Sequence, residues 1–158
     1  MSGQTVAENR KARFDYFLFD KYEAGIALKG SEVKSIREGG ANLQDSYIRL
    51  NAGEAFVVNL HVSPYRFAHD FLPEPTRSRK LLLKKREIEK MSVELARKGF
   101  VCVPLRIYFK RGFAKLEIAL AKRKKAYDKR ASLKEKIHAR EIDKAVKDSR
   151  GYNKKSRG

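Results

Sequence analysis

Cysteine is almost absent from this 158-residue chain, and Cys102, between two valines, is the only one. One thiol cannot form an intrachain disulfide, so the sequence excludes the disulfide-rich scaffolds of small secreted domains. A cysteine in such an apolar run is typical of a small buried side chain, not of a nucleophile. No stretch approaches the roughly 20 apolar residues that span a bilayer, and the polar N-terminus lacks the apolar core of a signal peptide. We therefore expect a cytoplasmic protein without a membrane segment.

The motifs of the common enzyme classes are also missing. The three histidines, His61, His69 and His138, show no metal-ligand spacing. Neither a Walker-type phosphate loop nor a G-x-S-x-G nucleophile motif is present. We therefore expect no catalytic residues, no metal and no cofactor. A catalytic pair assembled only in the folded chain stays open at this point, so an RNA-modifying or RNA-cleaving enzyme on a basic barrel is the alternative to a binding protein.

What the chain has in excess is positive charge. It carries 37 Lys and Arg against 19 Asp and Glu, a formal net charge of +18. Self-repulsion at this level destabilises a compact chain unless a polyanion offsets it, and nucleic acid is the first candidate. An anionic membrane surface is the second candidate. A ribosomal or membrane-surface basic protein is therefore a third functional alternative.

Apolar patterns of period two predict strands through most of residues 1–121. The clearest are residues 22–28, 47–50 with 55–62 across a glycine turn, 100–109, and 113–120. The last two segments each have one apolar and one polar face, as in an antiparallel sheet or small barrel. Pro104 cannot donate to a strand ladder, so we expect it at an edge or a bulge. The fold class we predict is mainly β with short helices, an antiparallel OB-like β-barrel over residues 1–121.

Two short helices interrupt these strands. Ser31 is placed to cap a short helix between two glycine positions, with Lys34 and Arg37 three residues apart on its solvent face. Apolar residues at spacings of three and four predict a longer helix over residues 84–98. Residues 63–79 are irregular and rich in proline, and a loop of this length is often functional.

The composition changes at Lys122. Residues 122–158 carry 15 Lys and Arg and 5 Asp and Glu. A thin apolar stripe at roughly helical spacing runs through Leu133, Ile137, Ile142 and Val146. Because so thin a stripe cannot form a core by itself, we predict a basic C-terminal tail, disordered when free, that becomes ordered or helical on a partner. A solvated charge run without a role is the alternative.

Aromatic side chains lie among these cations. Looped and single-stranded RNA is bound by stacking on aromatic rings together with cationic contacts to its phosphates. The candidates for stacking are Tyr16, Tyr22, Tyr65, Tyr108 and Tyr127. Taken singly, each tyrosine is more often a half-buried core residue, so the pattern indicates RNA binding only together with the charge.

Four motifs resemble the small protein B family, the protein partner of transfer-messenger RNA (tmRNA) in bacterial ribosome rescue. They are NRKARFDYF at residues 9–17, YEAGIALKGSEVKSIR at 22–37, PTRSRKLLL at 75–83 and AKRKKAYDKR at 121–130. Their order and spacing extend the resemblance over nearly the whole chain. The resemblance implies an OB-like antiparallel barrel that binds the tRNA-like domain of tmRNA and delivers it to ribosomes stalled without a stop codon.

The resemblance also implies site residues. The positions matching Asn9, Glu23 and Leu82 are important for RNA binding in the family, and Lys34 in the matching GSEVKS motif is the basic contact we predict beside them. Glu23 either accepts from base amino groups or orients a nearby lysine. Leu82 is either a core residue or an apolar contact to a splayed base.

The tail carries the last part of the resemblance. Asp128, Lys129 and Arg130 match the family's decoding-centre signature, and the tail is implied to form a helix in the empty mRNA channel of the small ribosomal subunit. Many members have histidine where this chain has Tyr127, a change that preserves stacking on an rRNA base but not a charged role. By family analogy alone, alanyl-tRNA synthetase and elongation factor Tu are further partners, and we expect a monomer.

Overall fold

The computed structural model describes residues 4–68 and 72–155 of the chain. These residues form two compact units that meet between Arg123 and Lys124. The last strand of the first unit ends at Arg123, two residues beyond the boundary that the composition indicated at Ala121. The second unit is a single helix. His69 and Phe71, which belong to the irregular stretch, lie outside the described residues.

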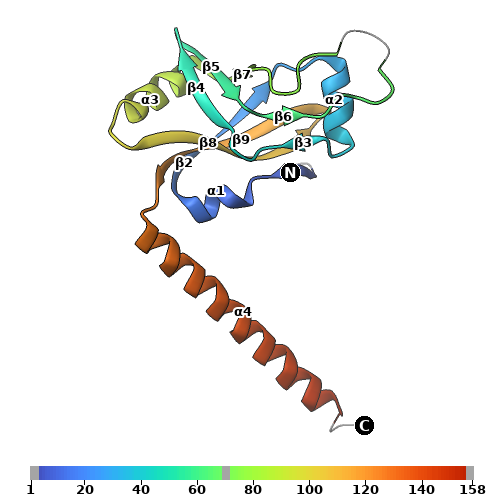
Figure 1. Ribbon diagram of the computed structural model, residues 1–158, viewed down its shortest axis with the longest axis vertical. Helices are drawn as coiled ribbons and strands as arrows, with labels where there is room; N and C mark the ends of the chain where they lie inside the picture. Colours follow the sequence, from blue (N-terminus) through green and yellow to red (C-terminus); the bar gives the residue numbers. More distant parts are fainter. Residues whose placement is uncertain (1–3, 69–71, 156–158) are drawn as a thin grey trace. The chain divides into compact units, whose positions relative to one another are not determined.

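Nine strands and three helices make up the described part of the first unit (Figure 1). The strands are β1 (Thr5–Glu8), β2 (Tyr16–Ile26), β3 (Ala41–Asn42), β4 (Tyr47–Asn51), β5 (Glu54–Val58), β6 (His61–Val62), β7 (Arg79–Leu82), β8 (Phe100–Lys110) and β9 (Phe113–Arg123). The helices are α1 (Arg10–Asp15), α2 (Gly30–Arg37) and α3 (Lys85–Leu95). The predicted hairpins and the helix at 84–98 are therefore confirmed, with the helix shorter at its C-terminal end.

Seven strands form one antiparallel sheet in the order β1-β8-β9-β2-β7-β5-β4, and β3 pairs with β6 in a second, two-stranded sheet. The mainly β, antiparallel fold class is confirmed. Among the described residues β1 and β4 are the edges of the large sheet, so its hydrogen bonding does not close into the predicted barrel. Strand β4 and the first residues of β8 line an apolar groove of about 580 Å³.

The long strands owe their curvature to local irregularities. The pairing of β8 with β9 shifts register between Pro104 and Arg106, which confirms the bulge expected at the proline. The pairing of β2 with β9 shifts between Leu18 and Lys21. Bulges bend a strand and increase its twist, so both shifts help the sheet to wrap around one core.

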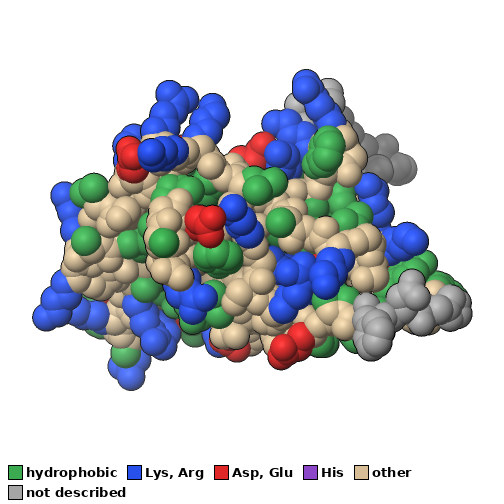
Figure 2. Space-filling model, turned by 90° about the horizontal axis from the view of Figure 1, so that it is seen from above, with side chains coloured by type: hydrophobic (Ala, Val, Ile, Leu, Met, Phe, Trp, Pro, Cys, Tyr) green, Lys and Arg blue, Asp and Glu red, His purple; other side chains and the backbone are tan. Residues whose placement is uncertain are grey.

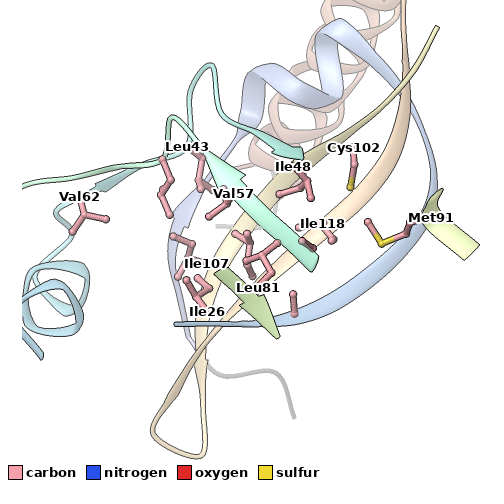
Figure 3. Packing of buried hydrophobic residues seen from close by; sticks show 14 of the residues in the cluster. Ile26, Leu43, Ile48, Val57, Val62, Leu81, Met91, Cys102, Ile107 and Ile118 are labelled. Atoms are coloured by element: carbon pink, nitrogen blue, oxygen red, sulfur yellow. The ribbon is translucent and has the colours of Figure 1, made fainter. Parts of the chain in front are cut away.

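The main core lies on the concave side of the sheet (Figure 3). Its central side chains come from four different strands: Ile26, Leu81, Ile107 and Ile118. Helix α3 adds Met91 and helix α2 adds Ile36, both fully buried, and the two helices lie at opposite ends of the strands in Figure 1. Burying each such side chain contributes about 1.5–3 kcal/mol. The alternating pattern located the core face of β9 correctly, whereas on β8 the bulge puts Leu105, expected beside Ile107, in a smaller cluster on the other side of the sheet.

Cys102 lies in the same core with 1% of its surface exposed. Burial raises the pKa of its thiol to about 12, so the thiolate that a nucleophile needs is not formed near neutral pH. The interpretation of this residue as a small buried side chain is confirmed. Among the described residues, no helix is both long and apolar enough to cross a bilayer.

Helix α1 packs on the opposite side of the sheet over a smaller cluster. Ala12 is its buried residue and contacts the region of Val103, Leu105, Ala119 and Ala121. Sequence patterns predicted neither α1 nor β1, because six residues with one apolar contact show no helical stripe.

Helix α2 begins differently from the prediction. Its N-cap is Lys29, so the capping role assigned to Ser31 was wrong. Ser31 is the second residue of the helix and therefore lies inside its first turn, and the carboxylate of Glu32 accepts from the backbone N–H of Lys29 at 3.0 Å. Gly39, at φ +84°, follows the C-cap residue, as expected for a left-handed helix end.

The second unit is helix α4 (Ala126–Lys155). Within its described side chains, the apolar residues Leu133, Ile137 and Ile142 are each about half exposed. The side chain of Lys124 donates to the Ser132 hydroxyl at 2.7 Å, and that hydroxyl donates to the Asp128 carbonyl at 3.0 Å. These bonds support the first turns of a helix whose apolar stripe is uncovered.

Candidate nucleic-acid interface

One row of residues crosses four strands on the convex face of the large sheet. Leu82 on β7 pairs with Gly25 on β2, Gly25 with Lys115 on β9, and Lys115 with Tyr108 on β8. Directly paired residues place their side chains on the same side of a sheet. Glu23, two residues from Gly25 along β2, shares that side. We call the face formed by these five residues the convex face.

Glu23 is held by two partners on this face. Its carboxylate accepts a hydrogen bond from the Tyr108 hydroxyl and forms an ion pair with the Lys110 ammonium at 3.5 Å. The hydrogen bond from Tyr108 and the charge of Lys110 lower the pKa of Glu23. Each of its oxygens has one of these partners, but the side chain is still 41% exposed, so the carboxylate is accessible to a ligand. The two roles predicted for Glu23, acceptor and lysine-orienting group, are both compatible with this geometry.

Tyr108 does not offer its ring for stacking. The guanidinium of Arg106 lies 4.4 Å from the ring centroid, and the residue is only 2% exposed. Arg106 in turn pairs with Glu117 at 3.1 Å. Burial and the hydrogen bond to Glu23 raise the pKa of the Tyr108 hydroxyl, which therefore stays protonated and donates. Together with Lys21, Tyr22 and Lys110, these residues line a depression of about 300 Å³.

Leu82 is exposed on the convex face and is not a core residue. Its side chain is 59% exposed, whereas the preceding Leu81 is 1% exposed and lies in the core. A Cβ added at Gly25 would lie 3.2 Å from the Leu82 Cβ and 3.3 Å from its Cδ1. Glycine at this position therefore lets the leucine lie across β2. The interpretation of Leu82 as a core residue is therefore wrong, and its apolar contact with a base stays a prediction.

Asn9 does not contribute to the convex face. It is 9% exposed, and its side-chain oxygen caps α1 by accepting from the Ala12 N–H at 3.2 Å. Its amide nitrogen donates to the Pro104 carbonyl at 3.0 Å and to the Leu43 carbonyl at 3.4 Å. The backbone N–H of Asn9 donates to the Leu105 carbonyl at 2.7 Å. Asn9 thus fastens α1 to β8, and the expectation that it shares one surface with Glu23 and Lys34 is wrong.

Lys34 lies on α2 and contacts the irregular loop. Its ammonium is 5.6 Å from the centroid of the Tyr65 ring, which meets the Phe67 ring edge-on at 5.6 Å. Arg37, one turn later, lies 4.2 Å from the centroid of the Phe109 ring and donates to the Gly112 carbonyl at 3.4 Å. The cationic face of α2 therefore connects the loop to the β8–β9 hairpin, which carries Lys110 next to Glu23.

A buried ion-pair cluster anchors that loop to α2. The Glu32 carboxylate, 2% exposed, binds the guanidinium groups of Arg77 and of fully buried Arg79. Arg79 also donates to three backbone carbonyls, those of Leu60, Pro75 and Arg77. Burial opposes ionisation of Glu32, but the hydrogen bonds from Arg77, the Lys29 N–H and Arg79 outweigh it and lower the pKa of Glu32. The cluster thereby ties the described end of the irregular stretch, at Pro75 and Arg77, to α2.

The predicted tail residues lie in the first turns of α4. Tyr127 is 80% exposed, Arg130 is exposed, and Asp128 and Lys129 are half-buried. Asp128 stands in the first turn, where a carboxylate is favoured by the helix dipole. All four belong to the second unit, separate from the convex face in the chain.

The arrangement of these groups favours binding to a polyanion. Figure 2 shows Lys and Arg side chains projecting around one whole face of the molecule, with only a few carboxylates between them. On the convex face the carboxylates Glu23 and Glu117 are already paired with Lys110 and Arg106. No group of three or more His, Cys, Asp or Glu in the described segments is arranged to hold a metal ion.

Sequence reasoning did not single out Arg37, Phe109 or Phe113 as functional. Phe113 is 71% exposed, and it has the same strand parity as Lys115 and Glu117 on the polar face of β9. The alternation of the strand could have indicated Phe113, because a phenylalanine at a polar-face position of an alternating strand is expected to be exposed. The contact of Arg37 with Phe109 joins residues 72 positions apart and has no local pattern.

Comparison with known proteins agrees with the motifs. The family model described as SmpB protein matches residues 6–148. An SsrA-binding protein of Sulfurihydrogenibium sp. (strain YO3AOP1) is 54% identical over 147 residues, which cover 93% of this chain and 97% of the relative. An SsrA-binding protein of Clostridium tetani (strain Massachusetts / E88) is 51% identical over 151 residues, 96% of this chain and 97% of the relative.

A solved structure is similar as well. A chain of the structure described as "tmRNA-SmpB: a journey to the center of the bacterial ribosome" aligns with a TM-score of 0.65 at 47% identity, over 75% of this chain and 84% of that chain. Identity of about one half along nearly the full length of its relatives, together with the family match over residues 6–148, shows that this chain belongs to the SmpB protein family.

Proposed function

We propose that this protein binds the tRNA-like domain of tmRNA and delivers it to stalled ribosomes for trans-translation. The observation that carries the proposal is the convex face, where Glu23 and exposed Leu82 lie together among cations. Such a face combines a hydrogen-bond acceptor for base amino groups, an apolar contact for an unstacked base and ammonium groups for phosphates. The similar proteins reported above are SsrA-binding proteins, and the similar solved structure is described as one of tmRNA and SmpB.

The barrel belongs to this proposal. We infer an OB-like barrel because the edge strand β4 and the start of β8 line the same apolar groove, so one edge of the sheet approaches the strand next to the other edge around one core. OB-like sheets present a curved outer face to oligonucleotides. In this chain the face with Glu23 and Leu82 would hold the RNA, and α2 with Lys34 would contact the same RNA beyond the hairpin.

The tail supplies the second half of the function. The exposed Tyr127 and the basic face of α4 fit a channel lined by rRNA phosphates, where Asp128, Lys129 and Arg130 would occupy the decoding centre. A helix with so thin an apolar stripe gains stability chiefly from a polyanionic surrounding. Contacts with alanyl-tRNA synthetase and elongation factor Tu rest on family analogy, and the place of action is the bacterial cytoplasm.

An electrophoretic mobility assay with the tRNA-like domain of tmRNA tests the binding step. We expect a shifted, chemically unchanged RNA and a much weaker shift with an elongated hairpin RNA of equal length. Sequencing of the RNA after incubation distinguishes binding from the enzyme alternative, because cleavage or modification would leave a chemical change. Wild-type protein that binds both RNAs equally would contradict the proposal.

A further inference from the structure

The tip of the β8–β9 hairpin carries an exposed aromatic ring that is not among the residues of the proposed interface. Arg111 and Gly112 have φ values of +52° and +80°, as in the two-residue turns that match strand twist. Lys110 and Phe113 pair across this turn. The Phe113 side chain is 71% exposed. The turn therefore places Phe113 at the end of the hairpin with its ring open to solvent.

Helix α2 holds the tip in place. The Arg37 guanidinium lies 4.2 Å from the Phe109 ring centroid and donates to the Gly112 carbonyl at 3.4 Å. Arg37 therefore contacts both the end of β8 and the turn itself. Because the turn is held before a ligand binds, little backbone ordering is lost when the Phe113 ring contacts a flat ligand.

The charges around the ring indicate what that ligand is. Arg37, Lys110, Arg111 and Lys115 all belong to the tip or its immediate supports, and the Glu23 carboxylate nearby is paired with Lys110. An apolar protein partner would have to desolvate these cations without a counter-charge. A nucleotide instead offers a flat base for the ring and phosphates for the cations.

We propose that Phe113 is a stacking platform for an unpaired base of the bound RNA. This inference rests on the proposed function and adds to it a contact at the tip between the convex face and the Lys34 side of α2. Lys110, which pairs with Phe113 across the turn, and Arg111 in the turn bind the phosphates that flank the stacked base. The stack is indifferent to base identity, because every base has a π-face.

The test measures the dissociation constant of the full-length protein for a transcript of the tRNA-like domain of tmRNA. Phe113→Ala should weaken binding by about 5- to 150-fold, the range of one base–aromatic stack. Phe113→Trp should restore affinity to within about threefold of the wild type, because the larger ring still stacks, and Phe113→Leu should not. Val93→Ala is the matched control, since Val93 is 65% exposed on α3, and it should leave affinity unchanged.

Salt dependence separates stacking from charge. Phe113→Ala should leave unchanged the slope of the logarithm of the RNA association constant against the logarithm of the salt concentration. Arg111→Ala should reduce the magnitude of that slope by about 0.7–0.9, which is the contribution of one phosphate contact. Thermal melts check that each variant is folded. A wild type that fails to bind this RNA overturns the proposed function itself. A wild type that binds, with Phe113→Ala or Phe113→Leu binding equally well, overturns only the stacking platform.

Discussion

The Tyr108 hydroxyl donates a hydrogen bond to the Glu23 carboxylate across an intervening strand, since β9 lies between β8 and β2. The same carboxylate pairs with Lys110, which follows Tyr108 by two residues on β8. Glu23 therefore fixes the position of one cation and keeps an exposed edge for a ligand. Glu23 can therefore act in two ways, as a hydrogen-bond acceptor for the RNA and as the residue that orients Lys110. Mutagenesis can separate the two.

Glu23→Ala should weaken binding of the tRNA-like domain by about 1–3 kcal/mol, the scale of one well-placed polar base contact. Its melting temperature should change little, because the side chain is 41% exposed and its ion pair with Lys110 is a surface pair. Lys110→Ala and the double variant complete a double-mutant cycle. Additive losses indicate a direct base contact by Glu23, and a double variant no worse than either single one indicates that Glu23 acts by orienting Lys110. Unchanged affinity in Glu23→Ala would remove the residue from the interface.

Leu82 and Leu81 provide a matched pair on adjacent positions of β7. Leu82→Ala should lower RNA affinity and leave the free energy of unfolding within about 0.5 kcal/mol, because Leu82 is 59% exposed. Leu81→Ala should do the reverse, with a loss of stability of about 2–5 kcal/mol, because Leu81 is 1% exposed in the core. Urea unfolding and RNA titration on both variants measure this. If both substitutions destabilised the protein equally, Leu82 would be a core residue.

Glu32→Gln should destabilise the protein by about 3–5 kcal/mol at neutral pH, because it leaves the buried charge of Arg79 without its counter-ion. Glu54→Gln is the control: Glu54 pairs with Lys80 at 3.2 Å, but both side chains are about half exposed, so the loss should stay below about 1 kcal/mol. Denaturant unfolding of both variants measures the difference. Similar small losses in both would mean that the buried cluster contributes no more than a surface pair.

The stability difference between the wild type and Glu32→Gln should also depend on pH. The folded-state pKa of Glu32 is lowered by its hydrogen bonds, below the ordinary value of about 4.3 that applies in the unfolded chain. Its contribution to stability is therefore complete above that value and is lost as the pH falls through the lower, folded-state pKa. The stability difference between the wild type and Glu32→Gln should be constant from pH 7 to 5 and shrink below about pH 4. A constant difference down to pH 2 would contradict the lowered pKa.

Features set by neighbouring residues in the sequence could be predicted, whereas contacts between residues far apart in the sequence could not. Alternation along β8 and β9 predicted both strands, because a strand's pattern is local, and on β9 it also predicted the face that lies in the main core. On β8 the predicted buried face was wrong, because the bulge after Pro104 places Leu105 in the cluster under α1 while Ile107 lies in the main core. The family motifs pointed to Glu23 and Leu82, but no local pattern indicated Tyr108 as the partner of Glu23, since that contact spans 85 positions and a third strand. For Asn9 the motif gave a role in RNA binding, which stays a prediction, but no local pattern indicated the hydrogen bonds by which it caps α1 and joins it to β8.

Salt should weaken RNA binding steeply. Each phosphate neutralised by Lys or Arg contributes about −0.7 to −0.9 to the slope of log K against log salt. With a formal net charge of +18, several such contacts are expected. The slope for the tRNA-like domain should therefore be about −3 or steeper. Titrations between 50 and 300 mM salt measure it. A nearly flat dependence would mean that contacts other than phosphate pairing hold the RNA.

The final prediction concerns the second unit, which should be dispensable for binding free tmRNA and required on the ribosome. Residues 122–158 carry a net excess of ten cations, but the first unit keeps the convex face and α2. Because β9 pairs with β2 through Arg123, the chain should be cut after Arg123 and not after Ala121, so that the Tyr16–Arg123 and Phe17–Lys122 pairs are preserved. The shortened protein should bind the tRNA-like domain within about tenfold of the wild type, roughly 1.4 kcal/mol.

On stalled ribosomes the same truncation should abolish peptide transfer to tmRNA, and so should joint replacement of Asp128, Lys129 and Arg130 by alanine in the full chain. The triple variant tests the decoding-centre role with the helix length unchanged, and alanine favours the helix, so a loss there points to the side chains and not to unfolding of α4. Transfer supported by the truncated protein would make the tail a solvated charge run. Loss of free RNA binding on truncation would instead mean that the second unit, and not the convex face, is the primary RNA site.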